Sequence, residues 1–179
     1  MNAKRRLALA VGPVVLLTAG FLAYSIYSKL QRKNAVQEFL HTLPAFQFTA
    51  LDSTQIGTDY ILTGQTAVLL FFSPDCEYCQ AQARVIGEQL SIFENVQFLW
   101  ISDGDTGVVR AFAARYGLDR KINSKVVTAP YGQIKNAFGV RQLPSALIYD
   151  EHHRFVRQFS GETKWEAIFA ALHDRAVIR

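Results

Sequence analysis

Residues 67–80 read AVLLFFSPDCEYCQ, and the order of signals in this stretch decides the fold. The run Ala67–Phe72 is continuously apolar, which is typical of a strand buried on both faces of a sheet. A helix is predicted over Glu77–Phe93, because apolar residues recur there at the 4-3-4-3 spacing of one helical face. Cys76 and Cys79, the only cysteines in the chain, therefore lie where a buried strand passes into an amphipathic helix.

The cysteine pair has the C-x-x-C spacing, which at a strand–helix junction indicates thiol–disulfide exchange. Cys76 is expected at the amino terminus of the helix, where free backbone N–H groups and the helix dipole favour an anion. A thiolate is the nucleophile of this exchange. Cys79 lies one turn later, heads the apolar face and is expected to be buried. We predict that Cys76 attacks a substrate disulfide and that Cys79 resolves the mixed disulfide.

Three other interpretations of the pair are a structural disulfide, a metal site and two unrelated buried thiols. A disulfide across so short a loop stabilises a fold by only about 2 kcal/mol in the loop-entropy treatment. Zinc usually takes four nitrogen or sulfur ligands, and no second C-x-x-C completes the set. The adjacent His152 and His153 fall in a predicted hairpin turn. We therefore expect neither a metal nor a cofactor.

The residues beside Cys76 bear on the redox direction. Asp75 and Glu77 flank it, and both negative charges oppose a thiolate there. Strong oxidants keep a very stable thiolate in their reduced form. The sequence therefore favours a reductant or mild exchanger over a strong oxidase.

Outward from the cysteines, strand and helix signals alternate. Further strands are expected at Phe46–Leu51, Tyr60–Leu62, Val96–Ile101 and a hairpin of Ser145–Tyr149 with Phe155–Phe159. Further helices are expected after Asp105 as far as Tyr116, over Tyr131–Phe138, and near the carboxyl end around Trp165. This order predicts an α/β fold, a mixed sheet with flanking helices on both faces.

A transmembrane helix is predicted at the amino-terminal end of the chain. Leu7–Ser28 holds 22 residues without a charge, and about 20 are needed to span a bilayer. The apolar region of a cleaved signal peptide, the alternative, is usually about 7–15 residues. We expect a basic segment at 1–6, an anchor at 7–28, a helical stalk at 29–43 and one globular domain at 44–179.

The charge is distributed unevenly along the chain. The net charge of +4 comes from 19 Lys and Arg against 15 Asp and Glu, but the first 33 residues hold six basic residues and no acid. A slightly acidic remainder removes the support for a nucleic-acid partner. Three basic residues stand on each side of the span, so the positive-inside count gives no orientation. We expect a single-pass inner-membrane protein with its carboxyl-terminal domain in the periplasm or cell exterior, because disulfide chemistry suits an oxidising compartment.

The sequence resembles the thioredoxin-like superfamily, specifically the TlpA/ResA-type membrane-anchored thiol–disulfide oxidoreductases. AVLLFF before SPDCEYC, the segment FGVRQLPSALIYD, the strand FVRQFSGE and the single amino-terminal span carry this resemblance. It implies a thioredoxin-like fold from about Phe46 onward, protein disulfides as substrates and a thiol-donating redox partner. It also implies that Pro144 is cis opposite the cysteines, and that Leu143 offers backbone groups to the substrate.

Two further features complete the sequence-based expectations. Tyr78, between the cysteines at the start of the helix, is expected on the docking surface for substrates. Leu70 stands where many thioredoxins have a buried acid, which leaves Glu77 or water as the proton acceptor for Cys79. A thiol peroxidase of the same fold is one alternative function, although its P-x-x-x-T-x-x-C pattern is absent. A metal-binding or assembly protein with the two cysteines as ligands is the other.

Overall fold

The computed structural model describes residues 18–28, 40–93 and 95–176. The chain divides into two compact units, Met1–Phe39 and Leu40–Arg179. In the first unit, residues 18–28 are helical. Among the described residues, no helix combines the length and apolarity needed to cross a membrane. Residues 7–17 of the predicted anchor and residues 29–39 of the predicted stalk lie outside the described residues.

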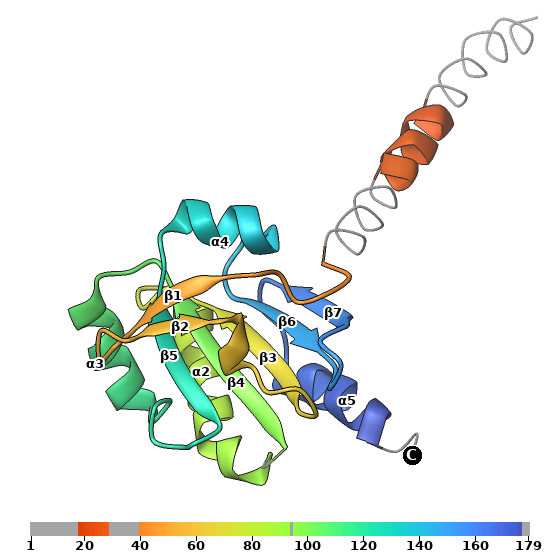
Figure 1. Ribbon diagram of the computed structural model, residues 1–179. Helices are drawn as coiled ribbons and strands as arrows, with labels where there is room; N and C mark the ends of the chain where they lie inside the picture. The colour runs from red at the N-terminus through yellow and green to blue at the C-terminus, as the bar shows by residue number, and fades with distance from the viewer. Residues whose placement is uncertain (1–17, 29–39, 94, 177–179) are drawn as a thin grey trace, which may run out of the picture. The chain divides into compact units, whose positions relative to one another are not determined.

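The second unit is built on a mixed sheet whose strands follow the order β2-β1-β5-β4-β3-β6-β7 in the described part of the chain (Figure 1). Their bounds are Gln47–Ala50 (β1), Gln55–Gly57 (β2), Thr66–Phe71 (β3), Val96–Ser102 (β4), Ser124–Thr128 (β5), Ser145–Tyr149 (β6) and Phe155–Ser160 (β7). The central strands β3, β4 and β5 run parallel, whereas β6 is antiparallel to β3 and β1 is antiparallel to β5. The central strands are buried on both faces, as their continuous apolar runs predict.

Helices cover both faces of this sheet. They are Glu77–Gln89 (α2), Thr106–Tyr116 (α3), Tyr131–Phe138 (α4) and Trp165–Ala176 (α5), with short 3-10 helices at Thr58–Tyr60 (η1) and Leu90–Ile92 (η2). One buried cluster joins α2, α3 and α5 to one face, through residues such as Ile86, Phe112 and Ile168. On the other face, Phe138 of α4 packs on Phe71 of β3, with ring centroids 5.2 Å apart. The predicted thioredoxin-like α/β fold is therefore confirmed.

Two local predictions need correction. Tyr60–Leu62 is not a strand: Tyr60 ends η1, and the buried Gln97 side chain accepts a hydrogen bond from the Leu62 N–H and donates one to the Tyr60 carbonyl. These tertiary hydrogen bonds satisfy backbone groups that a strand would have paired in a ladder. The helix predicted over Glu77–Phe93 ends as an α-helix at Gln89 and continues only as η2.

The globular unit contains its complete sheet and core. Leu40, at its first position, is already fully buried, and Thr42 forms an isolated bridge with Arg154. All of the strands named above, and the helices that cover them, lie between Leu40 and Ala176. A fragment that begins at Leu40 therefore retains every strand of the described sheet and the helices that cover it, and we expect it to fold without residues 1–39.

Candidate functional site

The two cysteines occupy the first turn of α2, directly after the carboxyl end of β3. Cys76 is the N-cap residue of the helix, and its sulfur accepts a hydrogen bond from the backbone N–H of Cys79 over 3.3 Å. The turn before it is fixed by the Cys76 N–H, which donates to the Ser73 carbonyl, and by the Gln80 side chain, which donates to the Pro74 carbonyl. A free backbone donor at a helix amino terminus thus points at a sulfur atom.

The cysteines differ in their access to solvent. Both are free thiols; Cys76 is partly exposed, whereas Cys79 is 1% exposed within the core cluster. Burial raises the pKa of the Cys79 thiol well above its ordinary value of 9.0, and hydrogen bonding to Cys76 raises it further. The partly exposed Cys76 sulfur therefore neighbours the buried Cys79 thiol, whose raised pKa keeps it protonated at neutral pH.

Among the residues that the structure describes, no carboxylate makes a hydrogen bond to Cys79. Leu70 is buried in the centre of the sheet, where it pairs with Trp100 and Ala146. Glu77 is exposed at the start of α2, and no hydrogen bond joins it to Cys79 in the described chain. Asp75 is also exposed. The flanking acids thus lie in water, which weakens their repulsion of a negative charge nearby but does not remove it.

The segment before β6 lies beside the strand that leads to the cysteines. The Leu143–Pro144 bond is cis, as the resemblance implies. Ser145, the next residue, pairs with Phe71, the last residue of β3. Leu143 and Cys76 both pack against the core cluster that contains Cys79. The fold thus brings this proline segment and the cysteine turn to the same end of the sheet.

A shallow groove of about 160 Å³ runs along α2 next to the proline segment. Tyr78 and Val85 of α2 line one side, and Pro144 and Trp165 line the other. Tyr78 is 57% exposed, whereas Trp165 is almost buried and donates from Nε1 to the Gln89 side chain. Tyr78 and Pro144 therefore lie together at the cysteine end of the domain, as lining residues of one groove.

Two contributors to the site were not identified from the sequence. Trp165 and the residues just before it, Glu162–Lys164, reach the groove because β7 and α5 return to the cysteine end of the sheet. Gly104, in the loop after β4, lies beside Pro74: a Cβ added there would be 3.4 Å from the proline ring, which is van der Waals contact. Neither carries a local sequence signal, since the contacts arise from sheet topology.

Metal ligands do not gather at this site. Among the residues that the structure describes, no group of three or more His, Cys, Asp or Glu side chains is arranged to hold a metal ion. His153 lies in the turn between β6 and β7, where its φ is 59°. The reactive groups that the described site presents are the two free thiols of Cys76 and Cys79.

Comparisons with known proteins extend over most of the chain. The model of the AhpC/TSA family matches residues 40–159. The curated thiol-disulfide oxidoreductase ResA from Geobacillus thermodenitrificans (strain NG80-2) is 26% identical over 172 residues, which are 94% of this chain and 95% of that protein.

Solved structures show the same fold. The structure of MTB dsbF in its mixed oxidized and reduced forms has a TM-score of 0.64 and 23% identity, and the match covers 76% of this chain and 96% of that one. A putative thiol:disulfide interchange protein DsbE from Chlorobium tepidum has a TM-score of 0.65 and 17% identity, over 74% of this chain and 94% of that one. At these identities the structures support the fold alone.

Proposed function

The chain belongs to the AhpC/TSA family and is an oxidoreductase of the thioredoxin-like fold; from this premise we propose that it is a membrane-anchored thiol–disulfide oxidoreductase acting on protein disulfides. The observation that carries the proposal is the pairing of a partly exposed, hydrogen-bonded Cys76 sulfur with a buried Cys79 thiol one helical turn away. The similarity to ResA over nearly the whole chain supports the same reaction class.

Cys76 performs the first step of the proposed reaction. Its thiolate attacks one sulfur of the substrate disulfide, so that a Cys76–substrate disulfide forms and the substrate disulfide breaks. The second substrate sulfur leaves as a thiolate and takes up a proton. The N–H of Cys79 stabilises the negative charge on the Cys76 sulfur before the attack.

Cys79 performs the second step. Its thiol gives up a proton to water or to Glu77, and the resulting thiolate attacks the Cys76 sulfur. A Cys76–Cys79 disulfide forms, the mixed disulfide breaks, and the substrate leaves with both of its cysteines reduced. The substrate has gained two electrons and two protons, and a thiol-donating redox partner returns them to the pair.

Substrate docking falls to the residues around the groove. Leu143 presents backbone groups to an extended substrate segment, and the adjacent Pro144 shapes the surface next to the cysteines. Tyr78 offers an exposed aromatic ring at the entrance of the groove. The acids at Asp75 and Glu77 favour a reductant or mild exchanger.

The proposed domain organisation follows the sequence. Residues 7–28 anchor the chain in the inner membrane, residues 29–43 form a stalk, and the thioredoxin-like domain from residue 44 works in the periplasm or cell exterior. The uncharged length of Leu7–Ser28 supports the anchor, since it matches the thickness of a bilayer. Resistance of the full chain to alkaline carbonate extraction, and digestion of the domain by protease added to spheroplasts, test anchoring and sidedness separately.

Reduction of insulin by the purified domain, with dithiothreitol as electron donor, tests the reaction. Cys76→Ser should reduce turnover to the background rate of dithiothreitol alone. When insulin is added to the reduced domain without dithiothreitol, Cys79→Ser should instead accumulate a covalent enzyme–insulin adduct, which later addition of dithiothreitol reduces. Asn136→Cys, a thiol added at an exposed position of α4 on the opposite face of the sheet, serves as the control for a non-specific thiol. Undiminished turnover in the Cys76 variant would exclude the mechanism.

Two further measurements separate the proposal from its alternatives. Hydrogen peroxide consumption driven by dithiothreitol at rates well above free cysteine would indicate a thiol peroxidase instead. Stoichiometric copper or zinc that is retained on purification, and lost on replacing either cysteine, would indicate a metal-binding protein. A reduction potential near that of the strong periplasmic oxidases would contradict the assignment as a reductant.

A further inference from the structure

The end of the domain opposite the cysteines carries its own chemical pattern. Cys76 follows the carboxyl end of β3, and β4 and β5 run parallel to β3. Val96 and Ser124, which begin β4 and β5, therefore lie at the far end of the sheet from the cysteines (Figure 1). The carboxyl ends of α2 and α3 also lie there, and with the loop before β5 they form a surface that the thiol chemistry does not use.

A basic pocket of about 420 Å³ lies on this surface. Three cations line it, Arg115 at the end of α3 and Arg120 and Lys121 in the loop before β5, against one acid, Glu88. In the described part of the chain, none of the three cations makes an ion pair. The neighbouring Asp119 is exposed as well, and its carboxylate accepts a hydrogen bond from the Val126 N–H, so it adds one negative charge beside the pocket. The three cations and Glu88 give the lining a net charge of +2, or +1 with Asp119, on a domain whose overall charge is close to zero.

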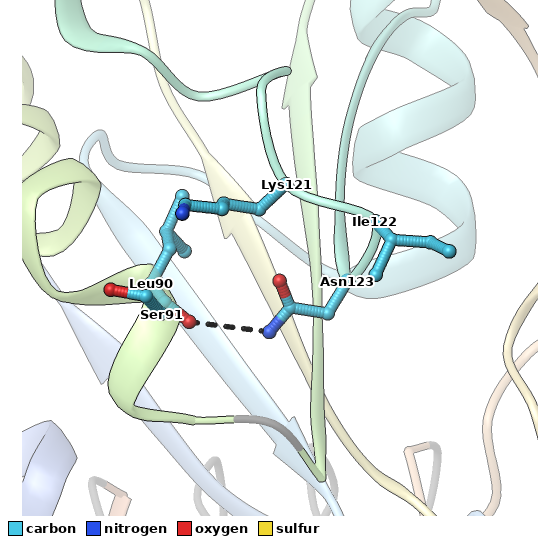
Figure 2. Close-up of a pocket in the computed structure, with 5 residues that line it drawn as sticks. All are labelled: Leu90, Ser91, Lys121, Ile122 and Asn123. Atoms are coloured by element: carbon cyan, nitrogen blue, oxygen red, sulfur yellow. Dashed lines mark hydrogen bonds between the residues drawn. The ribbon is translucent and has the colours of Figure 1, made fainter.

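An exposed aliphatic side chain stands beside the basic pocket. Ile122 is fully exposed, and Figure 2 shows it pointing away from Leu90, Ser91 and Asn123, with which it lines a second pocket. Ile92, in the segment that follows Leu90, is 65% exposed. Two large apolar side chains thus project into solvent next to unpaired cations.

The loop that presents Ile122 is held in place. The side-chain amide of Asn123 donates hydrogen bonds to the carbonyls of Leu90, Phe93 and Val96, the first of which is drawn in Figure 2. The Ser124 hydroxyl donates to the Leu118 carbonyl. These hydrogen bonds join the loop before β5 to η2, to the start of β4 and to the residues after α3, so the exposure of Ile122 belongs to a fixed conformation rather than to a free loop.

We propose that the basic end, defined as Arg115, Arg120, Lys121, Ile122 and Ile92, binds the surface of an anionic bilayer. The cations would pair with lipid phosphates, and the two isoleucines would enter the layer of headgroups and upper acyl chains. Two interactions attract a protein to such a surface: basic residues are attracted to anionic lipids, and exposed apolar side chains are buried in the interface. Each cation near an anionic surface strengthens binding roughly fivefold, and the effect is screened by salt.

The charges at the cysteine end of the domain determine which end would face the bilayer. Asp75, Glu77, Asp103 and Asp105 are all exposed in the loops and first helical turns after β3 and β4, on the side of the cysteines. An anionic bilayer repels these carboxylates while it attracts the basic end. The bound domain therefore presents Cys76 away from the membrane, toward soluble substrates. This orientation rests on the proposed membrane location, whereas the lipid binding itself does not.

Sedimentation with lipid vesicles tests the proposal on the fragment 40–179, which lacks the predicted anchor. The fragment should bind vesicles of phosphatidylcholine and phosphatidylglycerol (7:3) at least tenfold more strongly than pure phosphatidylcholine in low salt. Replacing all three cations, as Arg115→Gln, Arg120→Gln and Lys121→Gln together, should weaken binding about 100-fold. Ile122→Ser should weaken it about tenfold.

A matched variant removes the same charge elsewhere: Lys135→Gln, Arg141→Gln and Lys164→Gln, three exposed cations outside the basic end. The binding of this variant to the anionic vesicles should weaken by less than fivefold. Equal binding to both kinds of vesicle, or an equal loss in the two triple variants, would overturn the proposal. Release of the fragment by inorganic phosphate, but not by sodium chloride of the same ionic strength, would indicate a site for free phosphate and would also overturn it.

Insulin reduction by the same proteins keeps the two proposals separate. The Arg115, Arg120 and Lys121 triple variant should reduce insulin at the wild-type rate, because these residues lie at the far end of the sheet from Cys76. Lipid binding without insulin reduction would refute only the proposed thiol chemistry. Insulin reduction without preference for anionic vesicles would refute only the basic end.

Discussion

The backbone N–H of Cys79 donates a hydrogen bond to the sulfur of Cys76, 3.3 Å away in the first turn of α2. The sulfur occupies the N-cap position, where an oxygen acceptor usually satisfies this donor. A hydrogen bond to an anionic acceptor is stronger than one to a neutral acceptor. The helix amino terminus therefore directs a backbone donor at the Cys76 sulfur, whereas burial raises the pKa of the Cys79 thiol three residues later.

This difference predicts selective alkylation. At pH 7.5, iodoacetamide should modify Cys76 at least 100-fold faster than Cys79, because only a solvent-accessible thiolate reacts and the pKa of Cys79 is raised by its burial. Mass spectrometry of the peptides from quenched samples gives the two rates. Protein unfolded in 6 M guanidinium, in which the two thiols should react within threefold of each other, is the control.

The raised pKa of Cys79 also sets the pH dependence of the resolving step. Below pH 9.0, the ordinary pKa of this thiol, the thiolate fraction of Cys79 should rise about tenfold for each pH unit. The release of a preformed mixed disulfide between Cys76 and a peptide should accelerate accordingly in stopped-flow fluorescence. A release rate that is constant between pH 6 and pH 8 would contradict deprotonation of Cys79 as the controlling event.

The stability of the reduced protein should follow the same titration. The folded-state pKa of Cys79 lies above its unfolded value, so this group should not change the free energy of unfolding below about pH 9.0. The free energy should fall as the pH rises from there toward the folded-state pKa. Urea titrations at pH 8 and pH 10 measure this fall in the free energy of unfolding. The fall should be smaller in Cys79→Ala.

Tyr78 provides a prediction for substrate docking. The ring is 57% exposed and lines the groove that includes Pro144. Tyr78→Ala should raise the KM for insulin about tenfold, since an interfacial aromatic contact is worth roughly 1–2 kcal/mol. The rate with a small aromatic disulfide, which is too short to reach the groove, should stay within twofold. Tyr131→Ala is the matched control, because Tyr131 is 46% exposed on α4 and lies outside the groove.

Two helical glycines should respond to alanine with opposite signs. A Cβ on Gly87 of α2 would collide with the carbonyl oxygen of Tyr116, at the end of α3, whereas a Cβ on Gly132 of α4 would meet no atom within 4 Å. Gly87→Ala should therefore destabilise the domain by about 1–3 kcal/mol. Gly132→Ala should stabilise it by about 0.4–1 kcal/mol, because it removes conformational freedom from the unfolded chain. Urea denaturation followed by circular dichroism measures both.

The central strands and most helices of this fold could be predicted from the sequence because their signals are local. Thr106–Tyr116 shows this well: Asp105 caps its amino terminus and Gly117 ends it at φ 64°. Ala67–Phe72 is predictable as a buried strand because helices cover both faces of the sheet there, so nearly every residue of the strand is apolar. In each case the residues that decide the structure stand next to one another in the chain.

The remaining features depend on residues far apart in the sequence. The stretch Tyr60–Leu62 looked like a strand, but its backbone groups are taken by Gln97, more than 30 positions away. Trp165 lines the groove because the hairpin of β6 and β7 brings the start of α5 back to the cysteine end of the sheet. The cysteine pair was accessible to sequence reasoning since its spacing is local, whereas the groove beside it was not.

Asp150 is a buried carboxylate whose interactions concentrate in one turn. It lies at the end of β6, is 1% exposed, and accepts hydrogen bonds from the N–H groups of His152 and Arg154. The Arg154 guanidinium also pairs with it at 2.9 Å. Burial, the largest single influence, raises the pKa of Asp150, but hydrogen bonds from Arg154 and His152 together hold it below the ordinary value of 3.8.

Asp150→Asn should therefore destabilise the domain by about 1–3 kcal/mol at pH 7, because the amide cannot accept at both oxygens or balance the charge of Arg154. A folded-state pKa below the unfolded value means that the contribution of Asp150 is complete above pH 3.8 and is lost as the pH falls through the lowered pKa. Urea titrations at pH 7 and pH 3 should show the gap to wild type narrowing in acid. Glu162→Gln, at an exposed acid, should stay within about 0.5 kcal/mol at both pH values, and a gap for Asp150→Asn that is equal at both would contradict the role of its charge.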